Sequence, residues 1–337
     1  MRIAVDAYGG DNAPIEVIKG CVSAAREFDV EIVLCGREAE LTNLLKEYDY
    51  PKDRLSIRNA EEVITNEDSP VHAIRSKKNS SLMVALQMVK DGEAEAVISA
   101  GNTGAYFAGA FRVLGRIEGV KRPALATYIP NIKTGSIVLD VGANADCKAE
   151  HLLQFAVMGS LYAENVLGIA RPRVAIVNVG SEPGKGNELV KEAYPLLEQS
   201  RLNFTGNIEA RQIPYGDADV IVCDGFVGNV ILKLTEGLGI ALFGMVKDAL
   251  VKNMFTKLCA AILKPGLKTL KKKMDYSEYG GAPILGINGV AIKAHGSSDA
   301  KAFYNAIRSA LVFADTGVND KIRTELALQK EESEHEC

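Results

Sequence analysis

Four apolar segments of this chain each end at a short corner that combines glycine with asparagine. Glycine lets a backbone approach a ligand closely, and asparagine caps helices, whose first free N–H groups bind anions. If the preceding strands lie parallel in one sheet, all four corners lie at the carboxyl edge, where open α/β sheets bind ligands. The pattern predicts a shared anion site, although turn and capping preferences alone would explain any single corner. The corners are Ala100–Gly104, Asp140–Asn144, Gly184–Asn187 and Gly225–Asn229.

The third corner also carries a lysine, Lys185, between two glycines. A P-loop would need four residues between its glycines and a serine or threonine after the lysine. Residues 180–187 have three residues between the first two glycines, and Gly186 follows the lysine. Hydrolysis of a nucleoside triphosphate is therefore disfavoured. The lysine is still a compact cation for inorganic phosphate or for a developing oxyanion.

A second group of reactive side chains ends the last expected strand, where Lys293, His295 and Ser297 alternate. Alternate residues of a strand point to one side of a sheet, so these three are expected to share a face. His295 could act as a general base or donate a hydrogen bond to an anion, although a single histidine more often has a structural role. Cys147, one helical turn before His151, is a weaker alternative as a nucleophile that carries an acyl group.

The composition is that of an ordinary globular protein. The 337 residues are 47% apolar and 24% charged, with a net charge of −4, so binding to nucleic acid is not expected. Six scattered cysteines without C-x-x-C spacing and four dispersed histidines predict neither a zinc site nor disulfides. Four aspartates, Asp6, Asp11, Asp140 and Asp224, could surround a cation, but capping helices is their commoner role. We expect no metal and no cofactor.

The start of the chain predicts a cytoplasmic protein. It opens with a strand pattern, Arg2–Asp6, and lacks the apolar core of a signal peptide. The longest apolar run, Gly237–Val246, is shorter than the ~20 residues of a membrane-spanning helix. A membrane span is therefore not expected.

Short strand patterns alternate with amphipathic segments of helical length along most of the chain. The alternation predicts a three-layer α/β fold with a doubly wound, mostly parallel sheet. We expect an α/β core over residues 1–229, a helical insertion over 230–280, a return to the core over 281–328 and an acidic mobile tail over 329–337. The expected strands are Arg2–Asp6, Glu31–Cys35, Ala96–Ser99, Ala124–Ile129, Ser136–Asp140, Arg173–Val179, Val220–Cys223 and Val290–Ala294. The clearest helices are Pro14–Phe28, Ser80–Lys90, Tyr106–Leu114, Ala149–Asn165 and Asn187–Gln199.

The helical insertion is predicted to be a lysine-rich amphipathic hairpin. Eight lysines and a single acid, Asp248, lie between Lys247 and Lys273, and Pro265 with Gly266 predicts the turn. The apolar face could pack against the domain or a second subunit, or it could meet an anionic membrane or an acidic protein. Its members are Val251, Met254, Phe255, Leu258, Ile262, Leu267 and Leu270.

Five loop motifs closely resemble those of the bacterial acyl-[acyl-carrier-protein]:phosphate acyltransferases. Their order and spacing match over essentially the whole chain, from Met1 to about Val318. A match of five separated motifs is specific in a way that one glycine loop is not. The motifs are Asp6–Asp11, Ser99–Ala105, Asp140–Asn144, Asp224–Asn229 and Ile292–Asp299.

The resemblance implies a reversible transfer of a long-chain acyl group from the thioester of acyl carrier protein to inorganic phosphate. The product, an acyl phosphate, serves the first acylation of glycerol 3-phosphate, so later enzymes of phospholipid synthesis are implied partners. The family's core is related to phosphotransacetylases and isocitrate-dehydrogenase-like folds. The resemblance also implies a homodimer, and a hairpin that serves both the dimer and peripheral contact with the inner face of the cell membrane.

By the same resemblance, Lys185 and Asn229 are the catalytic pair, and we add His295 as a third catalytic candidate. Two positions depart from the family pattern, because Tyr8 replaces a usual methionine and Val227 replaces a frequent threonine. The expected substrate- or phosphate-binding residues are Gly101, Asn102, Thr103, Gly104, Asn144, Gly186, Asn187, Gly228 and Ser297.

Three other functional classes stay open at this point. A phosphotransacetylase would use short acyl-coenzyme A. A metal-dependent dehydrogenase has a related fold, but the chain lacks a G-x-G-x-x-G motif after its first strand. A membrane-recruited scaffold is the non-enzymatic alternative, for which four polar strand ends would be superfluous.

Overall fold

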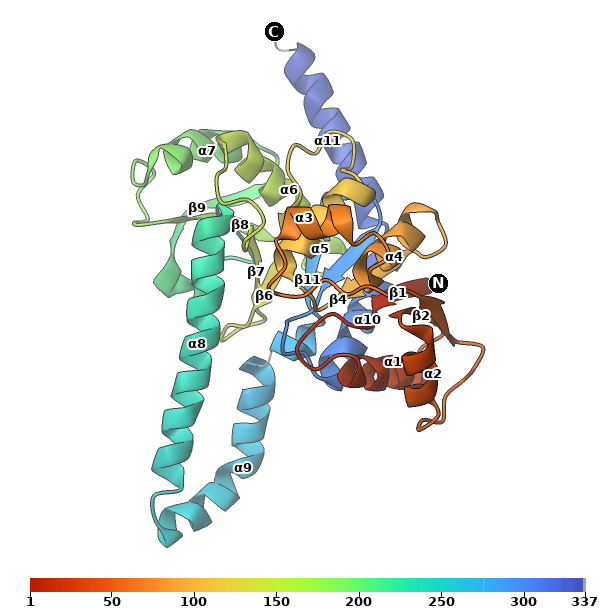
Figure 1. The fold of residues 1–337 in the computed structure, drawn as a ribbon. Coiled ribbons are helices and arrows are strands. Elements are labelled where there is room, and N and C mark those ends of the chain that lie inside the picture. The colour runs from red at the N-terminus through yellow and green to blue at the C-terminus, as the bar shows by residue number, and fades with distance from the viewer. Residues whose placement is uncertain (275, 336–337) are drawn as a thin grey trace.

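The strands of this chain form two sheets that pack into one α/β unit (Figure 1). The structure, a computed structural model, describes residues 1–274 and 276–335. In spatial order, the larger sheet contains β3 (Leu55–Asn59), β2 (Glu31–Gly36), β1 (Arg2–Asp6), β4 (Ala96–Ser99), β12 (Val290–Lys293), β11 (Ala282–Leu285) and β5 (Ala124–Leu125). The smaller sheet contains β6 (Thr127–Ile129), β7 (Ser136–Leu139), β10 (Val220–Val222), β8 (Arg173–Asn178) and β9 (Asn203–Glu209).

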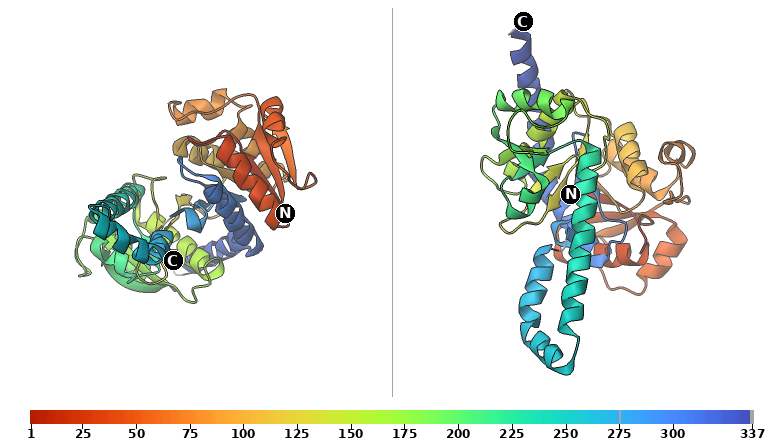
Figure 2. Two further views of the ribbon diagram at one scale, coloured as in Figure 1. Left: turned by 90° about the horizontal axis from the view of Figure 1, so that it is seen from below. Right: turned by 90° about the vertical axis from the view of Figure 1, so that its left-hand side faces the viewer.

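Most neighbouring strands run parallel, which confirms the predicted fold class. The antiparallel pairs are β11 with β12, β11 with β5, and β6 with β7. Helices surround both sheets (Figures 1 and 2). They are α1 (Ile15–Glu27), α2 (Glu38–Leu45), α3 (Pro70–Ser76), α4 (Ser81–Lys90), α5 (Thr103–Val113), α6 (Ala149–Asn165), α7 (Glu188–Glu198), α8 (Gly225–Leu250), α9 (Met254–Met274), α10 (Ala300–Asp315) and α11 (Val318–His335), with two short 3-10 helices, η1 (Ala210–Tyr215) and η2 (Tyr276–Tyr279).

A common hydrophobic core joins the two sheets. Strands β4, β7 and β10 are buried at every position, as expected for parallel strands covered on both faces. One continuous cluster contains Ile3 and Val5 from the larger sheet and Leu139 and Val222 from the smaller sheet. The two sheets therefore form one packed unit, and their strand ends hold fixed positions relative to one another.

The chain crosses between the sheets at Ala126, inside the segment predicted as one strand, Ala124–Ile129. Strand β5 pairs with β11 in the larger sheet, whereas β6 pairs with β7 in the smaller sheet. The buried Ala126 between them donates its N–H to the carbonyl oxygen of Pro283 at 3.0 Å. The predicted strand is thus two short strands.

Because there are two sheets, the expectation that all four corners follow strands of one sheet is wrong. The first corner follows β4, and the His295 segment follows β12, both in the larger sheet. The other three corners follow β7, β8 and β10 of the smaller sheet. The first corner can therefore meet the other three only across the junction of the two sheets.

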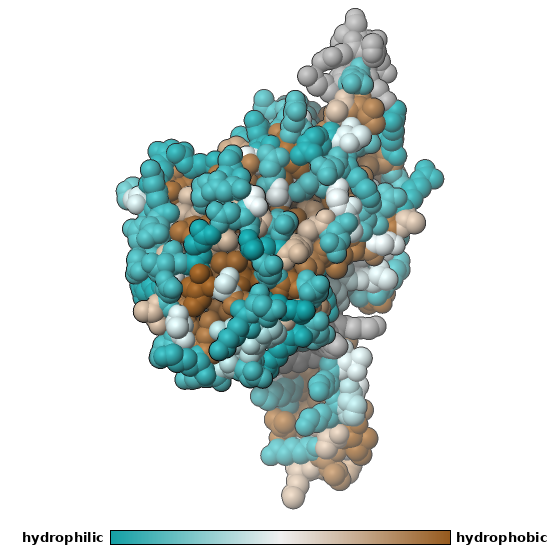
Figure 3. Space-filling view, turned by 90° about the vertical axis from the view of Figure 1, so that its right-hand side faces the viewer, coloured by the Kyte–Doolittle hydropathy of each residue, from teal (hydrophilic) through white to brown (hydrophobic). Residues whose placement is uncertain are grey.

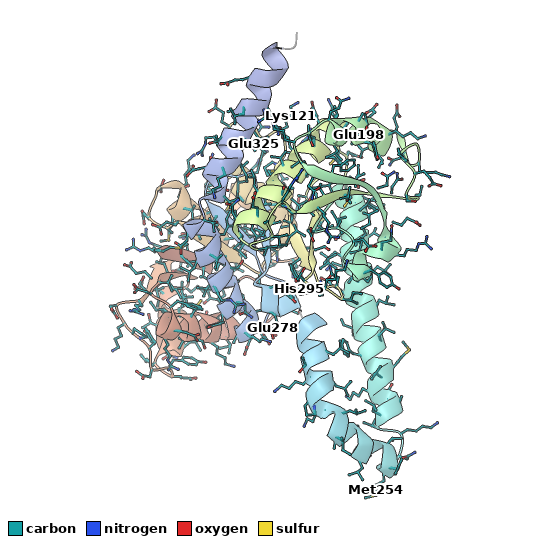
Figure 4. All side chains as sticks on the ribbon, turned by 180° about the vertical axis from the view of Figure 1, so that it is seen from behind. Lys121, Glu198, Met254, Glu278, His295 and Glu325 are labelled. Carbon is teal, nitrogen blue, oxygen red and sulfur yellow. The ribbon has the colours of Figure 1, made fainter. Side chains whose placement is uncertain are left out.

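Helices α8 and α9 form a hairpin that projects from the core (Figures 1 and 2). The hairpin turn lies at residues 251–253, and Pro265 lies inside α9, so the predicted turn at Pro265 and Gly266 is wrong. Figure 1 shows α9 bent, as expected where a proline removes a helical N–H donor. Met254 lies at the tip of the hairpin (Figure 4).

The predicted apolar face of the hairpin is open to solvent in this chain. The exposed fractions are 75% for Phe255, 65% for Leu258 and 75% for Ile262. Brown, hydrophobic side chains gather on the projecting hairpin in Figure 3. The face therefore does not pack against its own domain. The side chains of residues 271–273, three of the predicted lysines, lie outside those that the structure describes.

By length and composition alone, α8 could cross a membrane, because its 26 residues include an apolar window of which 11% is buried. The sequence analysis considered only the shorter run without polar residues. Lys233 and Glu236 in the first half of α8 form an ion pair at 2.8 Å. Since this half of the helix borders a polar cavity described below, we interpret α8 as a helix that leaves the core.

Helix α11 extends away from the core at the C-terminal end (Figure 1). It continues through His335, so residues 329–335 of the predicted tail are helical. Residues 336 and 337, the end of that predicted tail, lie outside the described residues.

Candidate active site

A polar cavity of 190 Å³ lies where the strand ends of the two sheets meet. The larger sheet contributes Thr103, Lys293 and His295, and the smaller sheet contributes Val141 and Asn229. Figure 4 shows His295 between the core and the base of the hairpin. We call this space the polar cavity. Its remaining lining residues are Leu125, Thr127, Tyr128, Leu232, Lys233, Glu236, Tyr279, Gly281, Ala282, Ala294 and Gly296.

Asn229 lines the polar cavity from one turn inside α8. The cap of this helix is Asp224, whose Oδ1 accepts the Val227 N–H at 2.9 Å, so the expectation that the asparagine caps the helix is wrong at this corner. The Asn229 side chain lies beside Gly142, because a Cβ added there would lie 3.7 Å from Asn229 Oδ1. An added Cβ at Gly228 would lie 1.8 Å from the Asp140 carbonyl oxygen. Glycine at 228 therefore lets α8 approach the second corner, and packing rather than anion binding explains it.

Asp140 fixes the second corner and connects the two sheets. Its carboxylate accepts the backbone N–H groups of Leu125, Ala143 and Asn144 at 3.0, 3.1 and 2.6 Å. Leu125 belongs to β5 of the larger sheet, so these bonds cross the junction. Burial raises the pKa of Asp140, and the hydrogen bonds oppose that shift.

Asn144, predicted to bind phosphate, braces this corner instead. Its Nδ2 donates to the Pro123 carbonyl oxygen at 2.8 Å and to Asp140 Oδ2 at 2.9 Å. Both amide protons are used within the fold, and the side chain is buried. Helix α6 begins only at Ala149, so Asn144 is not a helix cap either.

Lys293 is the cation that lines the polar cavity from the larger sheet. It is 8% exposed, and its Nζ donates to the Ala294 carbonyl oxygen. Burial lowers its pKa to about 8, and the negative charge of Asp6 opposes this shift. Asp6 is itself buried and accepts a hydrogen bond from Ser99 Oγ at 2.7 Å. The sequence analysis noted the alternation of Lys293 with His295 but assigned Lys293 no role.

His295 lines the same cavity as Lys293, although β12 ends at Lys293 and Ser297, the third residue of the expected group, does not line the cavity. Its Nδ1 accepts the Ser297 N–H at 3.2 Å and lies 2.8 Å from Ser297 Oγ. Burial lowers the pKa of His295, which favours the neutral ring. Because Nδ1 accepts, the proton of the neutral ring lies on Nε2. His295 is therefore better suited to donate a hydrogen bond than to act as a base, and Ser297 orients it.

Lys185 lies on the loop between β8 and α7. Asn178 holds this loop, because its Nδ2 donates to the Lys185 carbonyl oxygen at 2.9 Å. Gly186 has a φ of +103°, and a Cβ added there would lie 2.5 Å from Asn178 Oδ1, so only glycine fits. Asn187 caps α7 as predicted, since its Oδ1 accepts the Val190 N–H at 3.0 Å. The sequence analysis missed Asn178, which ends β8 like an ordinary turn residue.

The catalytic pair predicted by resemblance lies at one edge of the smaller sheet. Strands β8 and β10 are parallel neighbours, with Val222 paired to Ile176, so the loops after them leave the sheet side by side. Asn229 borders the polar cavity, whereas Lys185 is exposed on its loop and does not line that cavity. A role for Lys185 in the reaction therefore stays a prediction.

Most residues of the first corner position α5. Asn102 caps the helix by accepting the Ala105 N–H at 3.0 Å, and the Gly101 N–H donates to Ser99 Oγ at 3.0 Å. Gly104 packs against Pro70, which an added Cβ would approach to 2.9 Å. Of these four predicted binding residues, Thr103 alone lines the polar cavity.

The alternative nucleophile is not supported. Burial raises the pKa of the Cys147 thiol to about 12, so little thiolate forms at neutral pH. His151 is occupied as well, because its Nδ1 accepts the Lys148 N–H at 3.1 Å. Within residues 1–274 and 276–335, no cluster of three or more histidine, cysteine, aspartate or glutamate side chains could hold a metal ion.

The two departures from the family pattern lie outside the polar cavity. The Tyr8 hydroxyl donates to Glu40 Oε2 at 2.6 Å, and its ring contacts Gly36. Val227 is partly buried and packs against the core. Neither side chain lines this cavity.

Comparisons with known proteins identify the family to which this chain belongs. A family model described as "Fatty acid synthesis protein" matches residues 1–321. The chain is 55% identical over 322 residues to a phosphate acyltransferase from Alkaliphilus oremlandii, covering 96% of each chain. It is 51% identical over 327 residues to another from Desulfitobacterium hafniense, covering 97% of this chain and 98% of that one.

Solved structures share the fold at low sequence identity. A phosphotransacetylase from Streptococcus pyogenes superposes with a TM-score of 0.65 at 17% identity, covering 93% of this chain and 94% of that one. The EutD phosphotransacetylase from Staphylococcus aureus has a TM-score of 0.63 at 15% identity, covering 93% and 94% of the two chains. Likeness at this identity concerns the fold alone, and the family follows from the match over residues 1–321: this chain belongs to the fatty acid synthesis protein family.

Proposed function

We propose that this protein transfers a long-chain acyl group from the thioester of acyl carrier protein to inorganic phosphate. Relatives that are 50–55% identical over nearly their whole length are phosphate acyltransferases, and this similarity supports the same enzyme class here. The observation that carries the proposal is the polar cavity, where Asn229, Lys293 and His295 meet from two sheets. An acyl phosphate made in this way would feed phospholipid synthesis.

The residues of the cavity suit direct attack by phosphate. A phosphate oxygen bonds to the thioester carbonyl carbon, the C–S bond then breaks, and the carrier protein leaves as its thiolate. The Asn229 amide donates to the oxyanion that develops on the carbonyl oxygen, and His295 offers a second donor through Nε2. Lys293 in the cavity balances the charge of phosphate, and Lys185, on the neighbouring loop outside the cavity, is proposed to add a second positive charge. The high pKa of Cys147 is consistent with a route that has no covalent enzyme intermediate.

Formation of acyl phosphate tests the function directly. Purified protein is mixed with long-chain acyl carrier protein and inorganic phosphate, and the product is trapped with hydroxylamine as the hydroxamate. We expect hydroxamate that depends on both phosphate and enzyme. Activity with short acyl-coenzyme A but not with acyl carrier protein would instead indicate a phosphotransacetylase, and complete absence of product would favour a scaffold.

Lys293 should give the reaction an alkaline limit. Its pKa of about 8 means that the ammonium group is present below that pH and is lost as the pH rises through it. If the ammonium stabilises bound phosphate, kcat/KM for phosphate should fall about tenfold for each pH unit above 8, as for loss of a single essential proton. A pH profile from 6.5 to 9.5 measures this limit.

The matched variants for this profile are Lys293→Arg and Lys293→Met. Arginine keeps its charge over the whole range, so the alkaline fall should disappear in Lys293→Arg. Lys293→Met should be slow at every pH and show no fall above pH 8. An unaltered enzyme whose profile stays flat to pH 9.5 would contradict a role for this proton.

The hairpin is proposed to attach the otherwise cytoplasmic protein to the inner face of the cell membrane. Its exposed apolar side chains, which include Leu258 and Ile262, lie on a segment rich in lysine. Basic amphipathic helices bind anionic lipid surfaces through both features. The lysines also suit docking of an acidic carrier protein. We further propose a homodimer in which the exposed Leu234 and Leu238 of α8 pack against a second copy.

Replacing Leu258 and Ile262 together with glutamine should weaken binding to anionic vesicles about 100-fold. Burial of each apolar side chain contributes about 1.5 kcal/mol to the free energy of binding, and about 1.4 kcal/mol corresponds to a tenfold change in the binding constant. Vesicle sedimentation measures the affinity. The control replaces Ile132 and Leu196, which are 71% and 37% exposed on the core, and should bind normally. If sedimentation velocity shows loss of the dimer while vesicle binding is unchanged, the apolar face of the hairpin is a contact between subunits.

A further inference from the structure

A second cavity of 260 Å³ adjoins the polar cavity and has a different character. Its walls come from the first turns of α3 and α5, from the second corner and from β5, β11 and β12. The hydroxyl of Tyr106 points away from it, because it donates to the Val97 carbonyl oxygen at 2.8 Å. We call this space the apolar cavity. It is lined by Pro70, Val71, Thr103, Gly104, Tyr106, Phe107, Leu125, Gly142, Ala143, Ile284 and Lys293.

Three residues line both cavities: Thr103, Leu125 and Lys293. The two cavities are therefore neighbours, and these three residues form their common wall. Gly142 also lines the apolar cavity and lies beside Asn229, which lines the polar cavity. A group placed at this junction would have the Asn229 amide and the Lys293 ammonium nearby on one side, and apolar walls on the other.

We infer that the apolar cavity binds the part of the acyl chain nearest the thioester; the inference rests on the proposed acyl transfer. A fatty acyl thioester has a polar reacting end and a hydrocarbon chain, which matches a cavity lined by charged and amide side chains beside a cavity with mostly apolar walls. Apolar cavities stay dry and accept apolar ligands. The chain in the apolar cavity would present its carbonyl group at the junction, toward Asn229 and the phosphate.

The size of the apolar cavity sets how much of the chain it holds. A cavity of about 150 Å³ accepts benzene, so 260 Å³ holds on the order of ten carbon atoms by proportion. The remainder of a longer chain would leave past Val71, which is 53% exposed. Phe107, partly buried, also lines the apolar cavity, and Ala143 lines it without reaching the polar cavity. Both side chains are therefore suited to setting chain-length preference.

Enlarging Ala143 tests the inference. Leucine at 143 adds three carbons to the apolar cavity and removes space for the chain. Each substrate methylene group that can no longer be buried in the cavity lowers the affinity for the substrate about fourfold. We expect Ala143→Leu to lower kcat/KM at least tenfold for a 16-carbon acyl carrier protein and less than threefold for a 4-carbon one. Phe107→Ala adds space and should shift the preference toward longer chains.

The same substitution at an exposed alanine, Ala39→Leu in α2, is the control, because residue 39 lines neither cavity. Thermal unfolding verifies that each variant is folded. Equal losses for both chain lengths in Ala143→Leu, with an unchanged preference in Phe107→Ala, would overturn the inference. That result differs from failure of the proposed function, in which the unaltered protein would form no hydroxylamine-trappable product with either chain length.

Discussion

Replacing Asn229 with alanine is expected to lower kcat about 10²- to 10³-fold while leaving the fold intact. Asn229 lines the polar cavity. In the proposed mechanism its amide donates to the oxyanion formed when phosphate attacks the thioester. Removal of a single donor of this kind typically costs that much, because the cavity cannot replace it with freely arranged water. Since the donor matters most in the transition state, KM should change much less than kcat. Steady-state rates of acyl phosphate formation measure both.

Two variants separate this role from packing. Asn229→Asp keeps the size of the side chain but replaces the amide donor with a carboxylate, so it should be at least as slow as Asn229→Ala. Val230→Ala changes the neighbouring residue, which is 50% exposed and does not line the polar cavity, and should keep normal rates. A kcat for Asn229→Ala within threefold of the unaltered enzyme would remove the residue from the mechanism.

Replacing Lys185 with alanine should lower kcat/KM for phosphate about 10²-fold or more. The lysine lies on a loop fixed by Asn178 and Gly186, at the same sheet edge as Asn229. Its charge would stabilise phosphate and the negative charge that develops in the transition state. Because both ground and transition states carry charge on phosphate, the loss should divide between KM and kcat. Titration with phosphate at constant ionic strength gives the two constants.

The control for Lys185 is Lys191→Ala, which removes an equal charge from the exposed surface of α7. If general attraction between phosphate and a positive surface were the cause, both variants would lose activity alike. Near-normal turnover in Lys185→Ala, with the usual thermal stability, would refute the assignment of this lysine.

The sequence could predict the elements with strong local signals. Buried runs such as β4, β7 and β10 combine branched apolar residues with glycine corners, and helices such as α7 carry a polar cap. Strands β3, β9 and β11 were missed. Strand β3 is short and contains three polar residues, β9 is mostly polar with an internal glycine, and β11 contains Pro283. The division into two sheets could not be predicted, because strand pairing depends on contacts between distant segments.

In the candidate site, too, the roles that depend on contacts between distant segments could not be predicted from the sequence. Its loops were recognisable from their glycine and asparagine residues, yet most of these residues serve turns, caps and packing. Lys293 looked like an ordinary strand end, because nothing local shows that it would be buried between two cavities. Asp140 was noted only as part of a corner and as a possible cation ligand, because its hydrogen bond to the Leu125 N–H joins segments that are distant in the sequence. Such roles depend on tertiary structure.

Helix α8 extends without interruption from the candidate site, where Asn229 lies, to the exposed tip of the hairpin. It is a single rod of 26 residues, roughly 39 Å long at a rise of 1.5 Å per residue, with Asn229 near its fixed end and the exposed tip beyond its free end. A rod pivoting close to Gly228 acts as a lever, so displacement of the tip by several ångströms moves the amide by only a fraction of one. If the hairpin docks on a surface as proposed, movement of its tip would reach Asn229, the proposed oxyanion donor, only as a small shift.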